Sequence, residues 1–152
     1  MGSIFNKDFL DFLASLNDCN VRYLLVGGYA VILHGYNRST GDLDVWVQPT
    51  LENFFKLTNS FQKFGLPTEA ISKDQFLDSN GYDVFTFGIS PVAIDIMTHV
   101  KGLEFDFCYK NAVSYETDSL IIPLIHYNQL IESKKNVGRL KDLSDIENLE
   151  QE

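Results

Sequence analysis

The pattern of apolar and polar residues in the first third of the chain alternates between helical and strand periods. Apolar side chains recur at helical spacing over residues 5–16, and Asn6 is positioned to cap this amphipathic helix. Residues 22–26 form a short apolar run of strand length, and a pair of glycines separates it from a helix over residues 29–34. Residues 42–47 then alternate between polar and apolar side chains, which is the period of a strand with one buried face.

The middle of the chain predicts one more helix and a hairpin. Thr50 is placed to cap a helix over residues 51–64, and Gly65 follows as its stop. Two β-prone runs, residues 82–87 and 92–98, are separated by a short segment with glycine and proline, which is typical of an antiparallel hairpin. We therefore expect these two runs to lie side by side in one sheet.

The last third of the chain is mainly helical. A short helix is predicted over residues 103–110, and residues 120–124 predict a last strand at a sheet edge, where a proline is tolerated. Residues 126–137 predict a helix that Gly138 interrupts. Residues 140–149 then form a final helix with a narrow apolar stripe and an acidic outer face.

Length and composition favour one compact domain. The chain has 152 residues and 45% hydrophobic content, enough to fill a core. We expect a single domain over residues 1–152, with C-terminal helices at about residues 126–150. No apolar stretch approaches the roughly 20 residues that span a bilayer, and the amino terminus lacks an export signal. We therefore expect no membrane segment. Cys19 and Cys108 have no partner motif, which favours buried thiols in a reducing compartment, and we expect a cytoplasmic protein.

The net charge of the chain argues against one class of partner, a long nucleic acid. A net charge of −9 argues against a broad electrostatic grip on nucleic acid, which depends on neutralising phosphates with Lys and Arg. One stretch departs from this acidic balance. Four of the twelve basic residues lie close together, and they are Lys134, Lys135, Arg139 and Lys141.

The clearest candidate chemistry lies between residues 24 and 47, LLVGGYAVILHGYNRSTGDLDVWV. Gly27 and Gly28 stand at a strand-to-helix turn, where the backbone can come close to an anion such as phosphate. Asp42 and Asp44 are two residues apart on a predicted strand, so both carboxylates project from the same face. A cation relieves the repulsion between such charges, and oxygen ligands suit Mg²⁺.

A third aspartate belongs to the same prediction. Asp95 stands in the otherwise apolar strand predicted over residues 92–98, where packing alone would not select a charged residue. If that strand pairs beside the strand predicted over residues 42–47, the three aspartates converge on one or two metal ions. Such a cluster clamps a triphosphate and activates an attacking hydroxyl.

Each of these features alone also has a plainer interpretation. A glycine pair is often only a tight turn, and paired aspartates two residues apart also cap loops or face water at a strand end. Asp95 is compatible with an edge position and a solvated carboxylate. The order of a glycine pair, paired aspartates and a downstream aspartate on an apolar strand favours the joint functional interpretation.

The glycine pair, then Asp42-Leu43-Asp44, then Asp95, resembles the polymerase-β-type nucleotidyltransferase superfamily. Within it, the run GGYAVILHGYNRSTGDLDV and the later run LIESKKNVGRLKDLSDIENL are similar to small bacterial proteins related to abortive-infection nucleotidyltransferase toxins. The resemblance implies an α/β (α+β) nucleotidyltransferase fold, with a mixed β-sheet flanked by helices.

The resemblance also implies roles for these residues. Asp42 and Asp44 would bind Mg²⁺ or Mn²⁺, and Asp95 would be the third carboxylate at the metal and the base toward the acceptor hydroxyl. Gly27 and Gly28 would hold a nucleoside triphosphate. Many members carry a serine after the glycines, where this chain has Tyr29, so the candidates for a hydroxyl contact to phosphate are Ser39 and Thr40.

The basic residues add a second group of candidates. Lys134 and Arg139 match the superfamily's late Lys/Arg motif and could offset charge on a leaving pyrophosphate. The alternative is that they complement the negative end of the helix predicted over residues 126–137. Arg38 has two interpretations as well, a phosphate contact or a loop anchor.

Three functions remain open from the sequence. The first is a Mg²⁺-dependent enzyme that moves a nucleoside monophosphate from a nucleoside triphosphate to an acceptor, which is a small molecule, an RNA end or a protein. The second is the toxin of a toxin–antitoxin pair, with an antitoxin or a second copy of the chain as partner. The third is a non-catalytic module that binds a nucleotide or a partner.

Overall fold

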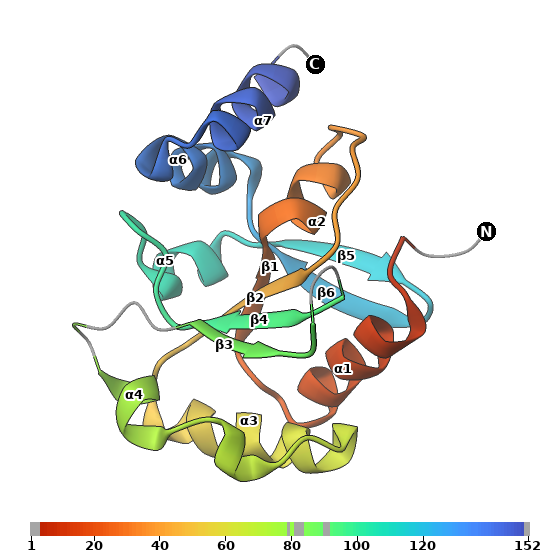
Figure 1. Ribbon diagram of the computed structural model, residues 1–152, viewed down its shortest axis with the longest axis vertical. Coiled ribbons are helices and arrows are strands. Elements are labelled where there is room, and N and C mark those ends of the chain that lie inside the picture. Colours follow the sequence, from red (N-terminus) through yellow and green to blue (C-terminus); the bar gives the residue numbers. More distant parts are fainter. Residues whose placement is uncertain (1–3, 79, 81–83, 90–91, 151–152) are drawn as a thin grey trace.

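The computed structural model of the protein describes residues 4–78, 80, 84–89 and 92–150 (Figure 1). Within these residues, six strands form one sheet in the order β3-β4-β2-β1-β6-β5. Their bounds are β1 (Tyr23–Val26), β2 (Leu43–Val47), β3 (Val84–Phe87), β4 (Ile94–Met97), β5 (Val113–Thr117) and β6 (Leu120–Leu124). The sheet is mixed, because β2 runs parallel to β4 and antiparallel to β1.

Helices cover both faces of the sheet. On one side lie α1 (Lys7–Asp18), α3 (Leu51–Phe64) and α4 (Lys73–Leu77), and on the other lie α6 (Tyr127–Val137) and α7 (Leu140–Glu150) (Figure 1). α2 (Gly27–Leu33) continues directly from β1, α5 (Phe105–Lys110) follows β4, and a 3-10 helix (Thr68–Ala70) precedes α4. The predicted mixed sheet flanked by helices is confirmed. In the described part of the chain, no helix has the length and apolar content to cross a membrane.

Local signals in the sequence set the ends of the long helices. The side chain of Asn6 caps α1 and that of Thr50 caps α3, each accepting a hydrogen bond from a backbone N–H three residues later. Gly65 ends α3 and Gly138 ends α6, both in the left-handed conformation that glycine adopts without strain. These four predictions are confirmed.

The residues of β2 divide between the two faces of the sheet. Leu43, Val45 and Val47 are fully buried and alternate with Asp44 and Trp46 on the opposite face. Burying each of these apolar side chains stabilises the fold by roughly 1.5–3 kcal/mol. A slip of one residue in register would turn Asp44 into the core, so burial of the apolar face also fixes the direction of the aspartate.

The predicted hairpin is present at one end of the sheet. β3 pairs with β4 in antiparallel register, with Thr86 opposite Asp95. β4 is shorter than the run predicted over residues 92–98. Tyr82 and Asp83 of the first run, and Ser90 and Pro91 of the turn, lie outside the described residues.

The prediction that residues 120–124 form an edge strand is wrong. β6 lies between β1 and β5, and β5 is the edge strand. A tight turn at Asp118 and Ser119 joins β5 to β6, and both residues have the positive φ values (46° and 67°) that two-residue hairpin turns favour. The usual glycine or asparagine is missing from this turn, and β5 is mostly exposed, so neither turn chemistry nor apolar alternation indicated the extra strand.

Candidate active site

The register of two parallel strands brings predicted site residues together. Asp44 of β2 pairs with Asp95 of β4, and the two side chains are hydrogen-bonded to each other. Asp42 lies just before β2, where its Oδ1 accepts a hydrogen bond from the backbone N–H of Ala93 at 3.0 Å. The pairing of β2 with β4, which was the condition for the aspartates to converge, is therefore present, and the hydrogen bond to Ala93 ties the start of β2 to the start of β4.

A cavity of about 840 Å³ opens over these carboxylates. It contains every residue that the sequence singled out as a candidate, namely Asp42, Asp44, Asp95, Gly27, Gly28, Arg38, Thr40, Lys134 and Arg139. Segments far apart in the chain supply them, because the α2–β2 loop and α6 contribute residues beside the carboxyl end of β1 and the amino ends of β2 and β4. The volume is in the range of sites that enclose a small ligand.

The glycine pair is required by the carboxylate beside it. Gly27 has a φ of +70°, and a Cβ at this position would collide with Oδ2 of Asp44. A Cβ at Gly28 would collide with Oγ1 of Thr40. The absence of both side chains lets Asp44 and Thr40 lie directly against the turn between β1 and α2.

Tyr29, which follows the glycines, belongs to the core. Its side chain is buried, and its ring lies 4.9 Å from the ring of Phe5 and 5.9 Å from that of Phe9. Ser39 and Thr40 both line the cavity, so hydroxyl groups reach it from the α2–β2 loop.

The electrostatics of the carboxylate pair favour uptake of a proton or a cation. The pKa of the Asp44 carboxyl is raised to about 7, first by burial and then by the charge and hydrogen bond of Asp95 and the charge of Asp42, while the charge of Lys134 acts in the opposite direction. A carboxylic acid of this pKa is largely protonated below neutral pH, because a second negative charge beside Asp95 is unfavourable in a half-buried site.

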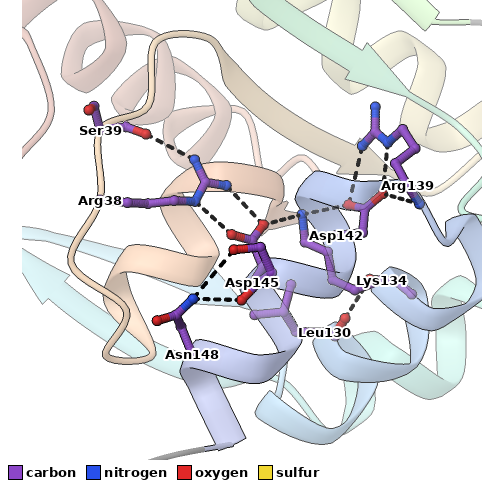
Figure 2. Close-up of polar contacts among 10 residues, drawn as sticks. Arg38, Ser39, Leu130, Lys134, Arg139, Asp142, Asp145 and Asn148 are labelled. Atoms are coloured by element: carbon purple, nitrogen blue, oxygen red, sulfur yellow. Dashed lines mark hydrogen bonds and ion pairs between the residues drawn. The ribbon is translucent and has the colours of Figure 1, made fainter.

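An ion network forms the opposite wall of the cavity (Figure 2). Nζ of Lys134 lies 3.2 Å from Oδ1 of Asp142 and 3.2 Å from Oδ2 of Asp145. Nε of Arg38 lies 2.9 Å from Oδ1 of Asp145. All four side chains are at least 86% buried, as their exposed fractions are 8%, 1%, 2% and 14%. The network links α6, α7 and the loop after α2.

Arg139 joins this network at the surface. Its Nε lies 2.7 Å from Oδ2 of Asp142, and its side chain is 65% exposed. Burial acts to raise the pKa of Asp142, but hydrogen bonds from Arg139 and Lys134 outweigh it and lower the pKa. Arg139 is therefore the exposed member of this ion network, and Lys134 is the buried member, held by two carboxylates.

Sequence reasoning missed Asp142 and Asp145. The predicted acidic outer face of the last helix is wrong for its first half, where these two residues are buried, whereas Leu140 and Leu143 are 87% and 48% exposed. Asp142 and Asp145 face inward because Lys134 and Arg38 provide buried positive charges. The two aspartates are three residues apart, so they lie on one face of α7, and they follow the basic cluster closely. This spacing is the signal that could have indicated a buried helix face paired with basic side chains.

The positions of Arg38 and Lys134 bear on the alternatives that the sequence left open. Arg38 also donates a hydrogen bond from Nη1 to the backbone oxygen of Ser39 at 2.9 Å, so it anchors the loop while lining the cavity. Lys134 lies in the last turn of α6, as the helix-end interpretation requires, yet its charge is directed to the carboxylates of α7. Both residues thus have structural partners inside the candidate site.

The carboxylates do not by themselves enclose an ion. Among residues 4–78, 80, 84–89 and 92–150, no three His, Cys, Asp or Glu side chains are arranged to hold one metal ion. Magnesium sites at nucleotide phosphates commonly use one or two carboxylates and complete their coordination with phosphate oxygens and water. Asp42 and Asp44 provide oxygen donors of that kind beside the cavity.

We predict that Asp44→Asn removes a pH-dependent loss of stability. The folded-state pKa of Asp44 is raised, so its contribution to stability is present at low pH and is lost as the pH rises from about 4 to about 7. Without divalent cations at pH 8, the variant should be more stable than the wild type by on the order of 2 kcal/mol. Urea unfolding across this pH range measures the effect. An equal dependence of the unfolding free energy on pH in both proteins would contradict the prediction. The control is Asp74→Asn, at an exposed aspartate on α4, which should behave like the wild type.

We predict that Asp145→Asn strongly destabilises the fold. The substitution leaves the buried charges of Arg38 and Lys134 with only one carboxylate between them, and breaking a buried ion pair on one side typically costs about 3–5 kcal/mol. Denaturant unfolding measures the change. The matched control is Glu147→Gln on the exposed face of the same helix, with an expected change below about 0.5 kcal/mol. Similar stabilities of the two variants would show that the network is not a structural element.

Comparison with known proteins identifies the fold. No family model matches the chain, and no curated protein matches its sequence. Among solved structures, the chain is similar to a Thermotoga maritima protein named "putative nucleotidyltransferase", with a TM-score of 0.60 and 15% sequence identity over 95% of this chain and 93% of that one. At this identity the likeness shows a shared fold, and the chain therefore has a nucleotidyltransferase-like fold.

Proposed function

We propose that this protein is a Mg²⁺-dependent nucleotidyltransferase that moves a nucleoside monophosphate from a nucleoside triphosphate to an acceptor hydroxyl. The observation that carries the proposal is a single cavity in which Asp42, Asp44 and Asp95 face Lys134 and Arg139 across a glycine turn. Positive and negative walls on opposite sides suit a ligand that combines phosphate groups with a divalent cation. The name of the Thermotoga maritima protein agrees with this class of reaction.

The carboxylates fit a divalent cation. Asp44 and Asp95 are hydrogen-bonded to each other and the pKa of Asp44 is raised, so a proton relieves a repulsion that a cation would relieve as well. We assign Asp42 and Asp44 to Mg²⁺ or Mn²⁺, with Asp95 as the third carboxylate beside them. When bound, the ion would neutralise charge on the triphosphate and on the attacking oxygen.

The remaining residues of the cavity would bind the triphosphate. Gly27 and Gly28 allow phosphate oxygens to approach the backbone, and Thr40 offers a hydroxyl next to them. Lys134 is fixed by its carboxylate partners, so its charge is positioned before the substrate arrives. Arg139, which is mostly exposed, can turn toward the leaving pyrophosphate.

Asp95 would accept the proton of the acceptor hydroxyl. It lies on β4 beside Asp44 of β2, and β4 is next to β3, the edge strand among the described residues. The acceptor oxygen would form a bond to the α-phosphorus as the bond to the β-phosphate oxygen breaks, and pyrophosphate would leave. Catalysis of this kind comes from positioning and charge neutralisation, without a covalent enzyme intermediate.

We predict that Asp42→Asn and Asp44→Asn each weaken Mg²⁺-dependent binding of nucleoside triphosphates by about 10-fold or more. Each substitution removes one anionic oxygen donor while preserving side-chain volume. Isothermal titration with ATP, GTP, CTP and UTP, with Mg²⁺ and with EDTA, measures the affinity. Asp74→Asn should bind like the wild type.

Equal affinity of all four proteins would end this assignment. A separate assay for pyrophosphate release in the presence of a cell extract distinguishes turnover from binding. Binding without release would favour the non-catalytic module over the enzyme.

A further inference from the structure

One row of side chains crosses the sheet from the glycine turn to its outer edge. The register places Asp44 of β2 beside Asp95 of β4, and Asp95 beside Thr86 of β3. Residues paired directly across neighbouring strands project from the same face. Thr86 therefore continues the line of carboxylates on the strand that ends the sheet.

The hydroxyl of Thr86 is bound to the carboxylate that we assign as the base. Oγ1 of Thr86 donates a hydrogen bond to Oδ1 of Asp95, with the two oxygens 2.7 Å apart. Thr86 is exposed and Asp95 is half-buried. A nucleophile and its base at 2.6–3.2 Å are the arrangement that activates a hydroxyl for attack. A hydroxyl of the chain itself therefore lies at hydrogen-bond distance from the proposed base.

We propose that Thr86 is a site of self-nucleotidylation. The proposal rests on the proposed nucleotidyltransferase function and names the first acceptor of that reaction. Oγ1 of Thr86 attacks the α-phosphorus of a bound nucleoside triphosphate, and its proton passes to Oδ1 of Asp95. The bond between the α-phosphorus and the bridging oxygen breaks, pyrophosphate leaves, and Thr86 carries a nucleoside monophosphate in a phosphodiester bond.

In this proposal, Thr86 is nucleotidylated only once on each chain. Modified Thr86 has no proton left to donate to Asp95, and the new phosphodiester adds a negative charge beside that carboxylate. The attached nucleotide also stands on β3, over the side of the site by which another acceptor would approach Asp95. The modified protein should therefore transfer nucleotide to other acceptors more slowly than the unmodified protein.

Intact-mass spectrometry of the full chain after incubation with each common nucleoside triphosphate and Mg²⁺ or Mn²⁺ tests the proposal. Wild-type protein should gain one nucleoside monophosphate, and peptide mapping should place it on Thr86. Thr86→Ser keeps the hydroxyl and should be labelled at the same position, whereas Thr86→Val should lose the label. The matched control is Thr117→Val, because Thr117 lies on the opposite edge strand and also donates a hydrogen bond to an aspartate, Asp118, at 3.2 Å.

A mixture of two inactive variants tests whether the reaction occurs within one chain. Thr86→Val retains the base and lacks the hydroxyl, and Asp95→Asn retains the hydroxyl and lacks the base. Because Thr86 is bound to Asp95 of its own chain, the mixture should stay unlabelled. Label on the Asp95→Asn chain would overturn the intramolecular reaction.

The outcomes separate this proposal from the function on which it rests. Label retained in Thr86→Val, or an unlabelled wild type that binds triphosphate and releases pyrophosphate in cell extract, would overturn self-nucleotidylation and leave the transferase intact. In the second case, slower pyrophosphate release by Thr86→Val would show that Thr86 only positions Asp95. A wild type that binds no triphosphate with Mg²⁺ would overturn both proposals.

Discussion

Two carboxylates held side by side on adjacent parallel strands are the constraint that organises this protein. The buried faces of β2 and β4 fix the register, and the register sets Asp44 next to Asp95. The repulsion between them cannot be relieved by rotation into water, because Asp44 lies against the turn at Gly27. The apolar core therefore holds two mutually repelling carboxylates at the amino ends of these strands, and a proton or a cation lowers this repulsion.

The ion network opposite these carboxylates contains a second set of buried charges. Lys134 carries positive charge toward the carboxylates, but a buried ammonium group requires partners of its own, and Asp142 and Asp145 supply them (Figure 2). Asp145 also binds Arg38, so the loop after α2 is fixed to α7. The C-terminal helices are consequently part of the site, because they hold the charges that face β2 and β4.

The sequence predicted the elements that depend on local chemistry and apolar alternation. The helix caps at Asn6 and Thr50 follow from such signals. The pairing of β2 with β4 entered only as the condition under which the aspartates would converge, and the structure contains that pairing. The sequence did not predict β5, whose turn reaches positive φ without glycine. It also placed the acidic residues of α7 outside, because periodicity assigns a charge to water unless the position of its partner is known. Arg38 lies 107 residues before Asp145, and only the fold brings them together.

The row from Val26 through Asp44 and Asp95 to Thr86 gives the candidate site a direction. Val26 is buried and Thr86 is exposed, so the row runs from a buried strand inside the sheet to its exposed edge strand β3. In the proposed reaction, the triphosphate belongs beside the glycine turn and Lys134, which line the cavity. The acceptor in this proposal then arrives over β3, which is the edge strand next to β4 among the described residues. The hydroxyl of Thr86 on β3 is already hydrogen-bonded to the proposed base Asp95, so it needs no binding step. In the proposed reaction, Thr86 therefore competes with external acceptors.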